Sequence, residues 1–95
     1  MDIHSGSFAW NAHREIENLK KHGVGFEEAA KAFSDPAIKI FIDAKHNGHE
    51  DRFFCVGKVG HKVLTVRFTY RDGKIRIFGA GYWRKGRVQY EKESA

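Results

Sequence analysis

The chain is short and basic, with enough apolar residues for a small core. Its 95 residues leave room for one core, so we expect a single domain over residues 1–95. A hydrophobic content of 41% argues against a disordered protein, and the lone cysteine, Cys55, excludes an intrachain disulfide framework. No stretch reaches the ~18 apolar residues that cross a bilayer, and the N-terminus does not resemble a signal peptide. We therefore expect a cytoplasmic protein without a membrane partner.

The net charge of +5 is unevenly distributed along the chain. Residues 1–51 carry six Lys and Arg against nine Asp and Glu, whereas residues 52–95 carry eleven against three. Positive charge concentrated on a folded segment favours a polyanionic partner such as nucleic acid. The alternative is a basic surface that serves solubility alone.

The first half of the chain is expected to form a short strand and two helices. Residues 7–10 have strand composition, and Asn11 can cap a helix that ends at Gly23. The apolar positions of this helix are Ala12, Ile16 and Leu19. A second helix ends before Asp35-Pro36. Its apolar residues recur at helical spacing: Phe26, Ala29, Ala30 and Phe33.

From residue 38 onward the pattern changes to that of β-strands. Four runs of β-branched and aromatic residues cover residues 38–42, 53–56, 63–70 and 74–78. Residues 83–93 are consistent with a short C-terminal helix. This order predicts an α+β fold, in which the two N-terminal helices pack on one face of a mainly antiparallel sheet of four to five strands.

The turn Asp72-Gly73 sets the register of the last hairpin. Arg71 is expected opposite Lys74, and the pairing continues until Arg67 lies opposite Phe78. One face of this hairpin is apolar. The opposite face, expected to be open, carries Thr65, Arg67, Thr69, Arg71, Lys74, Arg76 and Phe78.

Like charges opposite each other on a sheet repel, so this face favours a bound anion such as phosphate. Arginine forks and the threonine hydroxyls would bind the phosphate, and Phe78 or Tyr82 would stack on a base. The alternative is a solvated face neutralised by salt or by a protein partner.

A polar turn at residues 46–52 offers a second group of reactive side chains. Glu50 is a candidate general base and Arg52 a candidate phosphate clamp. His46 and His49 lie in the same turn, but a loop lacks the fixed spacing of a zinc site, and the distant His61 would have to complete it. We therefore expect neither a metal nor a cofactor.

Lys21 and His22 end the first predicted helix. They either complement its C-terminus or take part in RNA cleavage by the 2′-hydroxyl, which needs no metal. Cys55 lies within an apolar strand run and is expected to be a packing residue.

Residues along most of the chain resemble the BrnT family of type II toxins. The most specific segment runs from Lys21-His22-Gly23-Val24 to Phe26-Glu27-Glu28-Ala29, and it is followed by Glu50-x-Arg52 and Thr69-x-Arg71. The resemblance extends from Phe8 to Glu91. It implies a small RelE-like ribonuclease that inhibits translation by cutting RNA, including mRNA on the ribosome. It also implies a BrnA-like antitoxin, which neutralises the toxin and binds operator DNA.

The resemblance also implies roles for individual residues. Arg52, Arg71 and Arg76 would bind the phosphate and stabilise its developing charge, assisted by Lys21. Glu50 or His22 would be the general base, and the remaining one of the two, or Tyr82, the proton donor. Apart from the resemblance, further RNA contacts are expected from Arg67, Thr69, Lys74, Phe78, Tyr82 and Arg84. Arg67 has no clear counterpart in the family.

Two positions depart from the pattern of this family. Relatives usually carry an Ile-Ser-Ala-Arg stretch where this chain has residues 78–81, so that the arginine is replaced by Gly81. A glutamate common a few residues later is replaced by Gly86. A second hypothesis therefore stays open, a catalytically degenerate homologue that binds antitoxin or nucleic acid without cutting RNA. A nucleic-acid-binding domain unrelated to toxins is a third.

Overall fold

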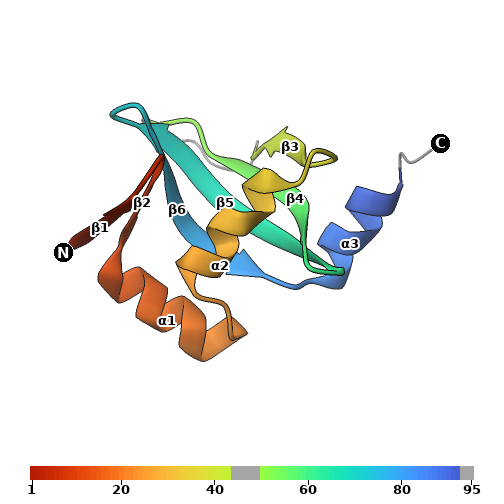
Figure 1. The fold of residues 1–95 in the computed structure, drawn as a ribbon, viewed down its shortest axis with the longest axis horizontal. Coiled ribbons are helices and arrows are strands. Elements are labelled where there is room, and N and C mark those ends of the chain that lie inside the picture. Colours follow the sequence, from red (N-terminus) through yellow and green to blue (C-terminus); the bar gives the residue numbers. More distant parts are fainter. Residues whose placement is uncertain (44–49, 93–95) are drawn as a thin grey trace.

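The computed structural model describes residues 1–43 and 50–92. Among them, six strands form one sheet in the order β1-β2-β6-β5-β4-β3 (Figure 1). The strands are β1 Asp2–Ser5, β2 Phe8–Asn11, β3 Lys39–Ile42, β4 Phe53–Val59, β5 Lys62–Arg71 and β6 Lys74–Gly81. The helices are α1 Ala12–His22, α2 Phe26–Ala30, the 3-10 turn η1 Lys31–Ser34, and α3 Arg84–Glu91.

The α+β class and the antiparallel character of the sheet are confirmed. Only the β2–β6 pair is parallel among the described strands, with Phe8 opposite Ile75 and Trp10 opposite Ile77. The strand count is higher than expected, because β1 was not predicted and β2 joins the sheet next to β6. None of the described helices is both long and apolar enough to cross a membrane.

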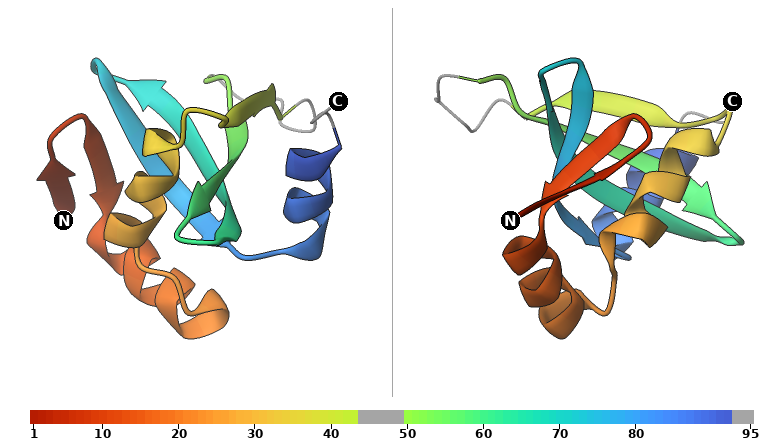
Figure 2. Two further views of the ribbon diagram at one scale, coloured as in Figure 1. Left: turned by 45° about the vertical axis from the view of Figure 1, so that its right-hand side comes forward. Right: turned by 60° about the vertical axis from the view of Figure 1, so that its left-hand side comes forward.

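Helices lie on both faces of the sheet, which corrects the expectation of one open face. In the right-hand view of Figure 2 the central strands pass between α2 and α3. α3 packs against β4 and β5 on the polar face, where Gly86 lies against Thr65. A Cβ on Gly86 would overlap the Thr65 hydroxyl oxygen, so the close approach of α3 depends on this glycine.

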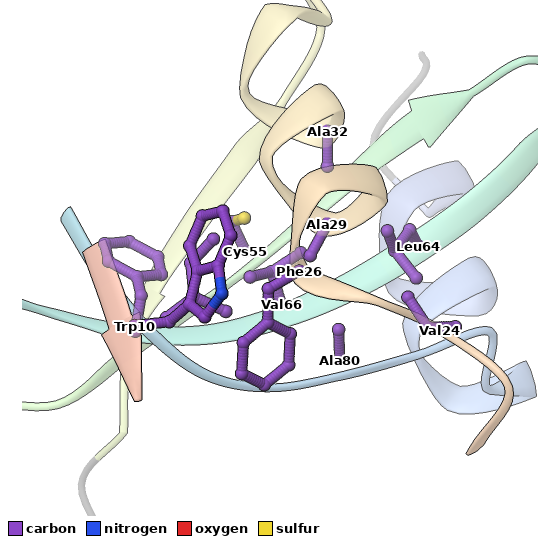
Figure 3. Packing of buried hydrophobic residues seen from close by; sticks show 11 residues of the cluster. Trp10, Val24, Phe26, Ala29, Ala32, Cys55, Leu64, Val66 and Ala80 are labelled. Carbon is purple, nitrogen blue, oxygen red and sulfur yellow. The ribbon is translucent and has the colours of Figure 1, made fainter. Parts of the chain in front are cut away.

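The core lies between α2 and the apolar face of the sheet (Figure 3). Its buried members are Trp10, Val24, Phe26, Ala29, Ala32, Cys55, Leu64, Val66, Phe68, Ile77 and Ala80. Cys55 is fully buried, and burial raises the pKa of its thiol to about 12, so the predicted packing role is confirmed. At Gly57 the η1 turn comes so close that an added Cβ would lie 2.5 Å from the Ala32 carbonyl oxygen.

The expected apolar face of α1 is wrong, although its ends are confirmed. Asn11 accepts a hydrogen bond from the Arg14 amide, and Gly23 ends the helix with φ of 71°. Ile16 and Leu19, however, are 52% and 53% exposed. The side of α1 that faces the protein is polar.

Asn18 is the buried residue of this polar side. Its amide nitrogen donates to the carbonyl oxygens of Val24 and Ala80, both at 2.9 Å, and its amide oxygen accepts from the Ala80 N–H at 3.2 Å. The carboxamide thus pairs with both backbone groups of one β6 residue. Because β2 ends at Asn11, Asn18 takes over the role of a strand neighbour for β6 beyond that point.

Glu15, one turn before Asn18, connects three elements. Its carboxylate accepts hydrogen bonds from the Trp10 indole N–H at 3.0 Å and from the Phe26 backbone N–H at 2.8 Å. The N-cap of α2, Gly25, has no side chain, so this carboxylate satisfies a free N–H at the start of α2.

The register of the last hairpin is confirmed from Arg71 opposite Lys74 to Phe68 opposite Ile77. It then shifts, so that Arg67 lies opposite Gly79 and not Phe78. Phe78 is the extra residue of a β-bulge, which the alternation of the sequence does not reveal.

Candidate functional site

A pocket of about 230 Å³ opens on the polar face of the sheet near the last hairpin turn. We call it the arginine pocket. It is lined by Asn11, Arg14, Glu50, Arg52, Thr69, Arg71, Arg76, Ile77 and Phe78. These residues come from the start of α1, from residues 50–52, and from β5 and β6, so segments far apart in sequence build one site.

Thr69 positions the segment that carries Glu50 and Arg52. It is buried, and its hydroxyl donates to the Asp51 carbonyl oxygen at 2.6 Å. This bond holds residues 50–52 against β5, directly across from Arg76 on β6. The Thr69 hydroxyl, expected to contact phosphate, is therefore already used within the protein.

Two of the four arginines form bidentate ion pairs with carboxylates. Arg71 donates to Glu50 at 2.6 and 3.0 Å, and Arg76 donates to Asp2 of β1 at 2.7 and 3.1 Å. Hydrogen bonds from the arginines lower the pKa of both carboxyl groups, even though burial acts in the opposite direction. Both carboxylates are thus ionised at neutral pH and neutralise part of the cationic charge.

The other two arginines form no close ion pair with a carboxylate among the described residues, although the charge of Arg52 helps to lower the pKa of Glu50. The Arg52 guanidinium lies 4.7 Å from the centre of the Phe78 ring, a cation–π contact that the β-bulge makes available. Arg14 is exposed in the first turn of α1, where the backbone N–H groups add partial positive charge. Planar guanidinium groups beside a helix N-terminus and an aromatic ring suit a phosphodiester with a base attached.

The structure places Lys21 and His22 outside this pocket. They lie in the last turn of α1, about ten residues and therefore roughly 15 Å along the helix from Asn11. The His22 ring instead contacts the edge of Trp83, with a centroid distance of 5.1 Å.

Tyr82, Lys74 and Arg84 also lie outside the arginine pocket. The Tyr82 hydroxyl donates to Glu28 of α2 at 2.5 Å, and burial together with this carboxylate raises its pKa to about 12. Lys74 Nζ lies 3.1 Å from His4 Nδ1 on β1. Arg84 is exposed at the start of α3.

A second cavity of about 540 Å³ lies on the same face of the sheet, against α3. We call it the α3 cavity. It is lined by Asp43, Phe54, Thr65, Arg67, Trp83, Lys85, Gly86 and Gln89. Arg67, expected beside Arg71 and Arg76, belongs to this cavity.

His46 and His49, considered for a metal site, lie outside the described residues. Within residues 1–43 and 50–92, no three His, Cys, Asp or Glu side chains are grouped so that they could hold a metal ion.

Three residues of the site were not predicted from the sequence: Asn11 and Arg14, which line the pocket, and Asp2, the partner of Arg76. Asn11 was expected as a helix cap, which places Arg14 one turn later at the same helix end. The parallel pairing of β2 with β6 brings the start of α1 to the pocket. A pairing between residues more than 60 positions apart cannot be predicted from a local sequence pattern.

Comparison with known families shows which family the chain belongs to. A family model described as the ribonuclease toxin BrnT of type II toxin–antitoxin systems matches residues 10–86. The chain belongs to the BrnT family. No match was found among curated proteins. The BrnT match includes every residue that lines the arginine pocket, whereas Asp2 lies before it.

Membership of the BrnT family implies RNA as the substrate class and an antitoxin as a partner. Six of the predicted site residues line the arginine pocket, namely Glu50, Arg52, Thr69, Arg71, Arg76 and Phe78, whereas Arg67 lines the α3 cavity on the same face of the sheet.

Proposed function

We propose that this BrnT protein is an endoribonuclease toxin that cuts RNA at the arginine pocket without a metal and thereby inhibits translation. The observation that carries the proposal is the convergence of Arg14, Arg52, Arg71 and Arg76 from four segments on one pocket. Guanidinium groups match phosphate oxygens in geometry and charge, so this arrangement fits a phosphodiester.

The reaction needs no group beyond RNA, protein and water. The 2′-hydroxyl oxygen attacks the adjacent phosphorus, and the bond from phosphorus to the 5′-oxygen breaks. The products are a 2′,3′-cyclic phosphate and a 5′-hydroxyl. Arg52, Arg71 and Arg76 stabilise the additional negative charge on the phosphate oxygens in the transition state.

Glu50 is the carboxylate best placed to take the proton of the 2′-hydroxyl, since it lines the same pocket. Arg71 holds its pKa below the ordinary value of 4.5, so Glu50 is ionised but weakly basic at neutral pH. His22 and Tyr82 lie outside the pocket, so water supplies the proton to the leaving 5′-oxygen in this arrangement.

RNA competes with protein carboxylates for two of the arginines. A bound phosphate has to replace Glu50 on Arg71 and Asp2 on Arg76, or share these guanidinium groups with them. Binding through phosphate contacts releases counterions, so RNA affinity should fall steeply as salt rises. Affinity that barely changes between low and moderate salt would argue against this pocket as the RNA surface.

A second function is favoured by the pairing of Arg71 and Arg76 with carboxylates and by the position of His22 away from the pocket. In this alternative the protein is a degenerate toxin that binds its antitoxin or nucleic acid without cutting RNA.

Regulated expression in a bacterial host separates the two functions. A ribonuclease toxin should arrest growth, and the purified protein should cut total RNA in the presence of EDTA. Arg71→Ala and Arg76→Ala should each reduce cleavage by about 100-fold or more. Arg87→Ala, an exposed arginine of α3 that lines neither cavity, is the matched control. Cleavage at the wild-type rate by both pocket variants would refute the site, and antitoxin binding without arrest would select the second function.

The partner we propose is a BrnA-like antitoxin that covers the arginine pocket and links the complex to operator DNA. An acidic antitoxin segment would pair with the same guanidinium groups as RNA, so blocking and neutralisation would coincide. Co-expression should restore growth, and RNA should compete with the antitoxin for the purified toxin.

A further inference from the structure

We propose that the α3 cavity binds one unpaired RNA base next to the phosphate held in the arginine pocket, and so determines which RNA sites are cut. This inference rests on the proposed function and adds the residues that would read the substrate. The volume of about 540 Å³ lies within the range of small-molecule sites and accommodates a single base.

Two aromatic rings line the cavity, and each is held by a neighbour that does not line it. Phe54 on β4 stacks on Phe41 of β3, with centroids 5.0 Å apart and planes 25° apart. The Trp83 indole contacts His22 edge-on and lies over Gly81, where an added Cβ would be 2.5 Å from the ring. Rings fixed in this way offer a preorganised stacking surface for an unpaired base.

Gly81 is also the position at which this chain departs from the BrnT pattern described above. Any side chain at residue 81 would displace the Trp83 indole. Compared with relatives that carry arginine here, the glycine therefore removes one positive charge and leaves room for the Trp83 indole to line the cavity. This exchange changes base recognition while the arginine pocket stays intact.

Polar groups in the cavity can distinguish one base from another. Thr65 is 8% exposed, and its hydroxyl oxygen is buried without a hydrogen-bond partner among the described residues. Gly86 of α3 covers this oxygen, so Thr65 contributes to the wall of the cavity and not to base recognition. The half-buried Gln89 of α3 adds an amide with both donors and an acceptor. Bases differ in the donors and acceptors along their edges, so the Gln89 side chain suits selection by hydrogen bonding.

The α3 cavity carries positively charged side chains and lies beside the arginine pocket along β5. Arg67 and Lys85, both exposed, line the cavity, and Asp43 is the carboxylate that lines it. Arg67 points to the same face of β5 as Thr69 of the arginine pocket, two residues or roughly 6.7 Å along the strand. A strand of RNA can therefore place a phosphate in one site and the neighbouring base in the other.

Tryptophan fluorescence tests this inference without relying on cleavage. The chain has two tryptophans, and Trp10 is 1% exposed in the core, so quenching by RNA reports on Trp83. The probes are 2′-O-methyl pentanucleotides of A, C, G or U, which cannot be cut, and matched oligonucleotides with one abasic position. We expect quenching that depends on the base, and affinity about 5- to 150-fold weaker for the best abasic probe.

Two variants separate base binding from a structural role of α3. Trp83→Phe keeps a ring over Gly81 and should abolish the quenching with only a modest loss of affinity. Gln89→Leu should reduce the differences in affinity among the four bases. Arg87→Ala, on the same helix but outside the cavity, should behave like the wild type, and circular dichroism verifies that each variant is folded.

Equal affinity for intact and abasic probes, without quenching, would overturn the inference even if Arg71-dependent cleavage is found. Base-dependent quenching by a chain that cuts no RNA would support the cavity and refute only the proposed activity. Quenching by the antitoxin but by none of the oligonucleotides would identify a protein as the occupant and overturn the inference as well.

Discussion

Asn18 offers the most direct test of how this fold is held together. Replacement by leucine, which has a similar shape, removes the hydrogen bonds to the Val24 and Ala80 carbonyl oxygens and from the Ala80 N–H. All three backbone groups would then lie beside an apolar side chain at a position that is 8% exposed.

The size of the effect follows from these three bonds. Each hydrogen bond contributes about 1 kcal/mol net, and each buried group left without a partner adds a further penalty, so Asn18→Leu should cost about 3 kcal/mol or more. A domain of this length has a free energy of unfolding of about 5–14 kcal/mol. The loss is therefore a large share of the total and corresponds to a melting temperature lower by roughly 12–24 °C.

Urea unfolding followed by circular dichroism measures this loss from the midpoint at an unchanged slope. Asn11→Ala is the matched control, since Asn11 caps the same helix through an exposed hydrogen bond and its removal should cost only about 1 kcal/mol. Asn18→Asp should be destabilised as well, but less at acid pH, because a carboxyl facing two carbonyl oxygens can donate only when protonated. A cost below that of Asn11→Ala would refute the strand-neighbour role of Asn18.

Three further predictions concern other parts of the structure. Asp35→Asn should lower the free energy of unfolding by about 1–3 kcal/mol at neutral pH, because three hydrogen bonds to the carboxylate are weakened. These bonds outweigh burial and lower the pKa of Asp35. Urea unfolding should therefore show a difference from the wild type that shrinks as the pH falls below 3.8. Gly57→Ala should cost about 1–3 kcal/mol by the same measure because the new methyl meets the Ala32 carbonyl, whereas Gly79→Ala should be mild because its neighbour lies 3.6 Å away. If Glu50 is the base, the rate of RNA cleavage should fall only below pH 4.5. A fall in the rate near pH 6.5 would indicate a histidine as the base instead.

Local sequence patterns predict much of the secondary structure. The predictions that are wrong concern residues whose partners are distant in the sequence. The spacing of Phe26 and Ala29 correctly identified a buried helical face, although the α-helix ends at Ala30 and continues as the turn η1. In α1 the apolar spacing of Ile16 and Leu19 was misleading, because the partner that buries Asn18 is Ala80, 62 residues away. A polar side chain can be read as buried only when its distant partner is known.

The candidate site shows the same division. Alternation along β5 and β6 placed Arg71 and Arg76 on one face, and the structure brings them to one pocket with Glu50 and Arg52. The bulge at Phe78 and the position of α3 then separate Arg67 from that group, and neither feature has a signal in the alternation.

The positive charges of the arginine pocket repel one another, and a carboxylate of β1 reduces this repulsion. Asp2 pairs with Arg76 from a strand that lies before the family match, so we expect it to stabilise the hairpin and to compete with RNA for Arg76. Asp2→Asn should therefore strengthen RNA binding and slightly lower the urea midpoint. Asp72→Asn changes the net charge equally at an exposed turn without releasing Arg76, and so serves as the control. If both variants bind RNA equally well, net charge alone sets the affinity, and Asp2 does not compete for the arginine pocket.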